Sequence, residues 1–165
     1  MATSLDGFTA EENGSVDWLN DFFHPGEDYG MQTFHEQCGT AIMGAKTYEQ
    51  TLSFNYWYGN MQGIVFTERD LPRIEGKSIQ FVSGDPKEIV LLLREKKKDS
   101  WLVGGSSLIS QFINKTLLNE MIITVVPRLL GKGLPICQDI KEIKKLKLDG
   151  TKTYKDGVVQ LKYSF

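Results

Sequence analysis

The chain alternates between short apolar runs that stop at glycine or polar residues and amphipathic stretches at helical spacing. The apolar run from Trp101 to Val103 stops at Gly104-Gly105, and apolar residues then recur at helical spacing from Leu108. This pattern predicts a buried strand, a glycine turn and a helix. Paired glycines let a ligand approach the backbone, and a helix N-terminus favours anions. The junction is therefore a candidate phosphate site, although any tight strand-to-helix turn can use the same glycines.

A second junction of this kind follows the apolar run Thr40–Met43. Gly44 ends the predicted strand, and a helix follows from Ala45. Lys46 and Thr47 add a cation and a hydroxyl where backbone donors converge. This arrangement suits phosphate oxygens, and it equally fits a solvated lysine beside a capping threonine.

Further apolar runs predict strands at 63–67, 79–82 and 120–126, and alternation near the C-terminus predicts an antiparallel hairpin. Repeated strand-helix-strand units call for parallel pairing with right-handed crossovers. We therefore predict a three-layer α/β/α sandwich with a mostly parallel mixed sheet and a C-terminal antiparallel hairpin. Ligands of such sheets lie at the carboxyl ends of the strands. The residues expected to gather there are Gly44, Thr67, Ser83 and Gly104.

The N-terminal segment begins with a short strand that ends at the turn signal Asp6-Gly7. The sequence leaves open whether this strand begins upstream of Met1. Apolar residues over 16–23 predict a short amphipathic helix. The acidic pair Glu27-Asp28 predicts the start of a second helix that runs to about residue 37.

The composition fits one globular domain over 1–165, with 41% hydrophobic and 24% charged residues. The formal net charge of -2 gives no reason to expect nucleic acid as a partner. No apolar run approaches the length of a membrane span, so we expect no membrane partner either. The two cysteines, Cys38 and Cys137, form neither a CxxC pair nor a disulfide framework, which favours a reducing, cytoplasmic location.

Four stretches that span nearly the whole chain carry a family resemblance. They are SLDGF with GSVDWL, AIMGAKTYE, WLVGGSSLISQFINKTLLNEMIITVVPRLLGKGLPIC, and TYKDGVVQLKYSF. Together they resemble the dihydrofolate reductase fold family, most closely the branch that includes the reductase domain of the bifunctional riboflavin-biosynthesis deaminase-reductase (RibD).

The resemblance implies that NADPH lies across the sheet, with one phosphate group at each of the two strand-to-helix junctions. It also implies that the residues after the strand at 63–67 lie near the adenosine. The cofactor-binding residues expected on this basis are Thr3, Gly44, Ala45, Lys46, Thr47, Thr67, Glu68, Arg69, Ser83, Val103, Gly104, Gly105, Ser106, Ser107 and Leu108.

The substrate pocket is expected near the opening strand, with Asp6 and Trp18 as candidate substrate contacts. Asp17 is a candidate catalytic acid, and a helix cap is an equal alternative for it. Asp28 is the other candidate, because dihydrofolate reductases hold the pterin with an acid about sixteen residues before the glycine that corresponds to Gly44. An acid at a helix start also has an ordinary electrostatic explanation.

The resemblance implies a homodimeric NADPH-dependent reductase that transfers a hydride to a small heterocyclic substrate. No metal site is expected, since His24 and His35 are isolated. Phe8 stands where the riboflavin-pathway reductases usually carry a basic residue, which favours an alternative: a non-catalytic dimeric nucleotide-binding or regulatory module. The aromatic residues Trp57 and Tyr58 are either subunit contacts or a cover for the local core.

Overall fold

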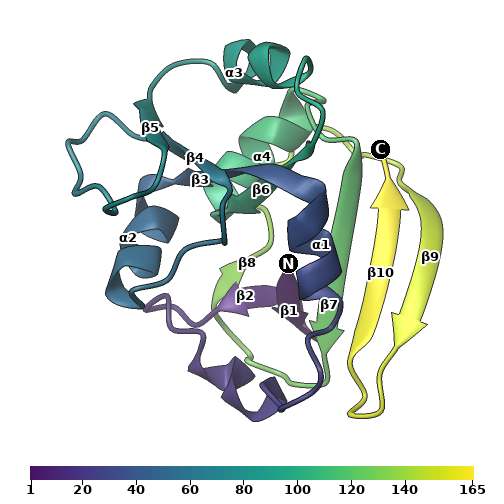
Figure 1. The fold of residues 1–165 in the computed structure, drawn as a ribbon. Helices are drawn as coiled ribbons and strands as arrows, with labels where there is room; N and C mark the ends of the chain where they lie inside the picture. The colour runs from purple at the N-terminus through teal and green to yellow at the C-terminus, as the bar shows by residue number, and fades with distance from the viewer. The chain divides into compact units, whose positions relative to one another are not determined.

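A computed structural model describes all residues from 1 to 165 (Figure 1). The chain divides into two compact units. Unit 1 comprises residues 1–29 and 112–165, and unit 2 comprises residues 30–111. Each unit contains a four-stranded sheet of its own, and the two sheets differ in the direction of their strands.

Unit 2 contains an entirely parallel sheet with the strand order β5-β4-β3-β6. Its strands are β3 (Cys38–Gly44), β4 (Gln62–Phe66), β5 (Ile79–Val82) and β6 (Asp99–Gly104). Its helices are α1 (Met31–Gln37), α2 (Ala45–Ser53), α3 (Pro86–Leu93) and the first part of α4 (Ser106–Asn114). Because parallel neighbours need a crossover, a helix or loop connects each strand to the next.

The core of unit 2 lies between β3, β4 and α2. Met43, Tyr48 and Val65 are 0% exposed, and the Tyr48 hydroxyl donates a hydrogen bond to the carbonyl of Pro72 at 2.6 Å. This bond satisfies the one polar atom that the buried ring brings into the core.

The aromatic segment 53–60 covers this core. The ring of Trp57 packs so closely on Gly63 that a Cβ there would lie 2.7 Å from it, and the Trp57 indole donates to the Met61 carbonyl at 3.0 Å. Tyr58 also packs on the core, whereas Phe54 and Tyr56 are exposed. For Trp57 and Tyr58 the structure therefore supports the local cover rather than a subunit contact.

Unit 1 contains a mixed sheet with the strand order β1-β7-β10-β9. Strand β1 (Ala2–Ser4) runs parallel to β7 (Glu120–Val126), and β10 (Val159–Ser164) runs antiparallel to both β7 and β9 (Lys147–Thr153). A two-stranded sheet joins β2 (Phe8–Ala10) to β8 (Leu134–Pro135), and a 3-10 helix, η1, spans Asp17–Phe22.

The structure confirms the mixed α/β class, the parallel pairing and the C-terminal antiparallel hairpin. It corrects the start of the second N-terminal helix, which was expected at Glu27. Helix α1 begins at Met31, after Tyr29 and Gly30 with φ of 52° and 79°. These left-handed conformations interrupt a helix, so the acidic pair lies in a turn before it.

Candidate functional site

The carboxyl ends of the four strands of unit 2 meet at one edge of the sheet. Gly44 is in register with Phe66, Phe66 with Val82, and Met43 with Gly104. The residues that follow β4 and β5, Thr67 and Ser83, therefore lie at the same edge as the two glycines. The sequence predicted that these strand ends would gather, and the register confirms it.

The two strand-to-helix junctions adjoin at this edge. A Cβ added to Gly105 would lie 3.6 Å from Thr47 Oγ1, and one added to Gly44 would lie 4.0 Å from the Gly104 carbonyl oxygen. Gly104 has φ of 132°, a conformation that disfavours other residues, and its peptide bond to Gly105 is cis. The absent Cβ atoms leave the backbone open between the starts of α2 and α4.

Both helices that begin here direct their N-terminal N–H groups to this edge. Neither α2 nor α4 has an acidic residue in its first turn, and the N-cap of α2, Gly44, makes no side-chain cap bond. Lys46 and Ser107 are exposed in these first turns. Two positive helix ends with a nearby ammonium and hydroxyls form a site with the chemistry to bind an anion.

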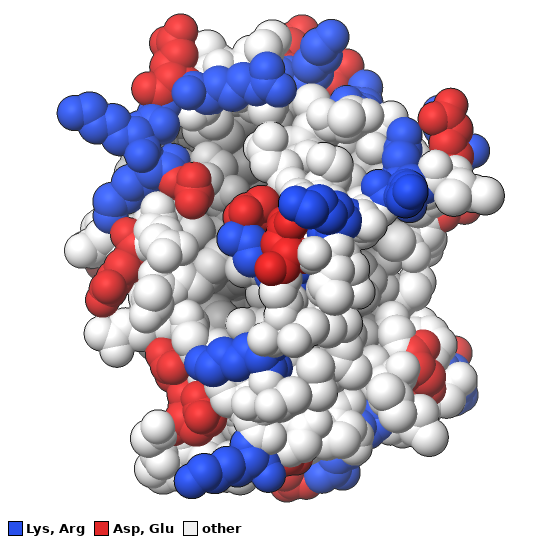
Figure 2. Space-filling model, turned by 90° about the vertical axis from the view of Figure 1, so that its right-hand side faces the viewer, with Lys and Arg blue, Asp and Glu red and all other residues white.

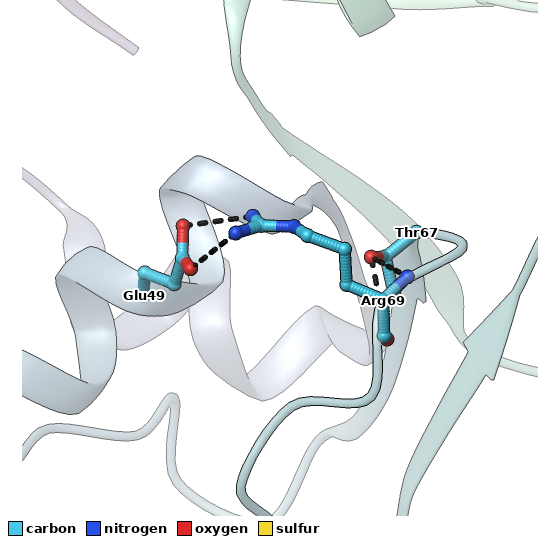
Figure 3. Close-up of polar contacts among 3 residues, drawn as sticks. All are labelled: Glu49, Thr67 and Arg69. Atoms are coloured by element: carbon cyan, nitrogen blue, oxygen red, sulfur yellow. Dashed lines mark hydrogen bonds and ion pairs between the residues drawn. The ribbon is translucent and has the colours of Figure 1, made fainter.

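Arg69 is the second cation at this edge, and it is engaged by Glu49 of α2 (Figure 3). Its two terminal nitrogens donate to the two Glu49 carboxylate oxygens at 2.8 and 2.9 Å. The Arg69 backbone N–H donates to Thr67 Oγ1 at 2.9 Å. The bond from Arg69 lowers the pKa of Glu49, and Lys46 acts in the same direction. Arg69 was among the residues predicted from the sequence, whereas its partner Glu49 was not.

The remaining predicted cofactor residues of unit 2 differ in accessibility. Glu68 and Ser83 are exposed after β4 and β5, and Val103 is half-buried in β6. Leu108 is 6% exposed in α4, so only its backbone is available to a ligand.

The predicted cofactor residue Thr3 and the predicted substrate contact Asp6 lie in unit 1, where their polar atoms bind the chain itself. The buried Thr3 hydroxyl is within hydrogen-bond distance of the carbonyls of Ser4 and Phe8, at 3.1 and 3.2 Å. Asp6 accepts from Ser4 Oγ at 2.6 Å and from the backbone N–H groups of residues 130 and 131 at 3.1 and 2.7 Å. These bonds, led by the one from Ser4, lower the pKa of Asp6. The geometry supports an anchor for the loop after β7, and a substrate role for Asp6 stays a prediction.

The other candidates of unit 1 lie on or near η1. Asp17 is exposed in its first turn, where the Ser15 hydroxyl accepts the Asp17 N–H at 3.1 Å. The N-cap of η1 is Val16 and makes no side-chain cap bond, so Asp17 does not cap this helix. The Trp18 indole nitrogen is buried without a hydrogen-bond partner. Asp28 is exposed in the turn before α1 and not at a helix start, so the electrostatic explanation given for it is wrong.

A contact between residues far apart in the sequence secures this turn. The Tyr29 hydroxyl bonds the carboxylate of Asp156 in the β9–β10 hairpin and the carbonyl of Phe22. Burial and the Asp156 charge raise the pKa of Tyr29 to about 12. No local pattern in the sequence indicates a pair separated by 127 positions.

The charge distribution on the surface and the character of the helices bear on the kinds of partner considered above. On the face in Figure 2, basic and acidic side chains are interspersed and form no large field of one sign. None of the helices has the length and apolar character needed to cross a membrane.

The parallel sheet, the helices that start at its carboxyl edge and the antiparallel strands form a mixed α/β fold of the dihydrofolate reductase type. The chain belongs to the RibD C-terminal domain family, which matches residues 1–160. It is 34% identical over 166 residues to the uncharacterized protein YwjB of Bacillus subtilis strain 168, covering 99% of this chain and 94% of that protein. The predicted family resemblance is confirmed.

Two solved structures show the same fold. A putative riboflavin biosynthesis protein from Shewanella sp. PV-4 has a TM-score of 0.88 at 27% identity, covering 99% of this chain and 95% of that one. Dihydrofolate reductase from Enterococcus faecalis, in a complex with NADP(H), has a TM-score of 0.68 at 16% identity, covering 99% and 92%. The second likeness concerns the fold alone.

Proposed function

We propose that this protein is an NADPH-dependent reductase that transfers a hydride to a pyrimidine or pteridine-like heterocycle, similar to 5-amino-6-(5-phosphoribosylamino)uracil reductase. The observation that carries the proposal is the pair of adjoining junctions in unit 2, where Gly44 and Gly105 leave the backbone open beside Thr47. The family match and the NADP(H) complex of the Enterococcus faecalis enzyme support it.

The donors at the sheet edge fit the phosphates of a dinucleotide. The first turns of α2 and α4 offer backbone N–H groups, Thr47 and Ser107 offer hydroxyls, and Lys46 offers an ammonium. Bound NADPH supplies the hydride, so the chain needs no nucleophile or metal for that step. The protein's own part is to bind and orient: the glycines admit the phosphates, and the helix ends and Lys46 offset their charge.

A non-catalytic nucleotide-binding or regulatory module on the same fold is the second candidate. It is favoured by Phe8, an apolar residue of β2 at the position where a basic residue would hold a phosphorylated substrate. The two candidates differ in turnover. A reductase oxidises NADPH when supplied with a dihydropteridine or a riboflavin precursor, whereas the module binds nucleotide without turnover. The homodimer and the cytoplasmic location remain predictions under both.

Replacing Ser107 by Asp tests the site without disturbing the fold. A carboxylate in the first turn of α4 interacts favourably with the helix dipole, so stability should be kept or rise, while the same charge repels phosphate. We expect the Ser107→Asp variant to bind NADPH about tenfold more weakly, followed by protein fluorescence.

Ser78→Asp is the matched control, because Ser78 is exposed just before β5, at the opposite end of that strand, and the charge change is the same. It should bind NADPH like the unmodified protein. Equal affinity of the two variants would contradict the proposed site, and absence of NADPH binding by the unmodified protein would contradict the proposed cofactor.

A further inference from the structure

The two cationic side chains at the sheet edge of unit 2 differ in how readily an anionic ligand can bind them. Among the strand-end and first-turn residues assigned to the cofactor, Lys46 and Arg69 are the two cations. Lys46 is exposed in the first turn of α2. The Arg69 guanidinium, in contrast, is engaged by Glu49 through both of its terminal nitrogens, at 2.8 and 2.9 Å. An anionic ligand therefore encounters one accessible cation and one that already has a carboxylate partner.

Glu49 lies close to the proposed phosphate site. It is four residues after Ala45, the first residue of α2, so the two share a helix face about 6 Å apart along the axis. Figure 3 shows its carboxylate extending from α2 to the guanidinium of Arg69, which comes from the segment after β4. The pair thus spans two of the segments that converge on the edge.

The pair is solvent-exposed, with the Arg69 and Glu49 side chains 55% and 41% accessible. An exposed pair of this kind is weak and exchanges partners readily. A phosphate dianion can accept two parallel N–H bonds from a guanidinium, as a carboxylate does, and it carries more charge. Phosphate can therefore replace Glu49 on Arg69, but only against the carboxylate's competition and its repulsion at close range.

We propose that Glu49 is a specificity-determining residue that competes with a ligand phosphate for Arg69 and so limits the preference for NADPH over NADH. The inference rests on the proposed function, because NADPH differs from NADH by one phosphate on the adenosine ribose. Arg69 must give up its ion pair with Glu49 before it can bind that additional phosphate. The proposed role concerns the choice of cofactor and not the hydride transfer.

The test is to measure the affinities of Glu49→Gln for NADPH and NADH by fluorescence titration. Glutamine keeps the shape of the side chain and removes its charge. We expect the Kd for NADPH to fall about three- to fivefold and the Kd for NADH to change less than twofold. Glu88→Gln is the matched control, since it removes one exposed carboxylate from α3 of the same unit. It should change neither affinity.

A second variant separates competition from positioning. Arg69→Gln should weaken NADPH alone, and Glu49→Gln in that background should improve NADPH binding by less than it does with Arg69 present. Weaker NADPH binding by Glu49→Gln, no change, or equal changes for both nucleotides would overturn the inference while leaving the reductase proposal intact. If the unmodified protein binds neither nucleotide, the proposed function fails and this inference fails with it.

Discussion

The two units use their polar groups in opposite ways. The sheet edge of unit 2 carries the N-termini of α2 and α4 and the exposed Lys46. Its glycines leave the backbone open between the two helices. In unit 1, Asp6 and Tyr29 bond to other parts of the chain and hold its loops in place. Under the proposed function, the polar groups at the edge of unit 2 face a ligand, whereas those of unit 1 face the chain itself. The partners that each group already has decide between the two roles.

The largest expected effect comes from the core of unit 2. Tyr48→Ala removes a ring that is 0% exposed and should lower the free energy of unfolding by about 3–5 kcal/mol, the range for large aromatic truncations. NADPH binding should be lost together with stability. Tyr48→Phe keeps the ring and should lose only about 1–3 kcal/mol, because it leaves the Pro72 carbonyl without the hydroxyl donor. Urea unfolding of both variants measures the difference, and equal losses would contradict this assignment of the ring and the hydroxyl.

A smaller effect is expected from unit 1, where Gly133→Ala should disturb the pairing of β2 with β8. A Cβ at this position would lie 2.2 Å from the Ala10 carbonyl oxygen. Backbone must shift to admit it, at a cost of about 1–3 kcal/mol in the free energy of unfolding. If the phosphate site belongs to unit 2, the affinity for NADPH should stay within about twofold. A tenfold loss of affinity in a folded Gly133→Ala protein would contradict the assignment of the phosphate site to unit 2.

The smallest predicted effect is a pH dependence in unit 2. Burial lowers the pKa of His35 below its ordinary value of 6.5, and its ring packs against Trp101 at 5.3 Å. The unfolded chain then binds the proton more tightly, so stability should fall as pH decreases from 6.5 through the lowered folded value. Urea unfolding at a series of pH values measures this slope. His35→Phe should flatten it, and an unchanged slope would assign the dependence to other groups.

The residues of unit 2 were predictable because their signals are local. Gly44 and Gly104 each stand where an apolar run meets an amphipathic stretch, and parallel pairing brings such ends to one edge without further information. The helix over 106–114 could also be predicted from its apolar spacing. The structure buries all four residues of that pattern, which are Leu108, Ile109, Phe112 and Ile113.

The contacts that escaped prediction join distant positions. Glu49 and Arg69 are 20 residues apart and meet only because α2 and the end of β4 converge. Asp6 binds the backbone of two residues that lie 124 and 125 positions away, and no local pattern distinguishes that anchor from a pocket acid. Asp28 was placed at a helix start because the acidic pair resembles an N-terminal turn. The left-handed conformations of Tyr29 and Gly30 delay the helix to Met31.

The most direct test of the account is to titrate isotope-labelled protein with NADPH and follow the backbone amide resonances by NMR. The account predicts that the largest shifts fall on the strand ends and first turns of unit 2, at residues 44–47, 67–69 and 104–108. Saturable shifts confined to other residues, or no shifts at millimolar NADPH, would contradict the assignment of the cofactor site to this edge of the sheet.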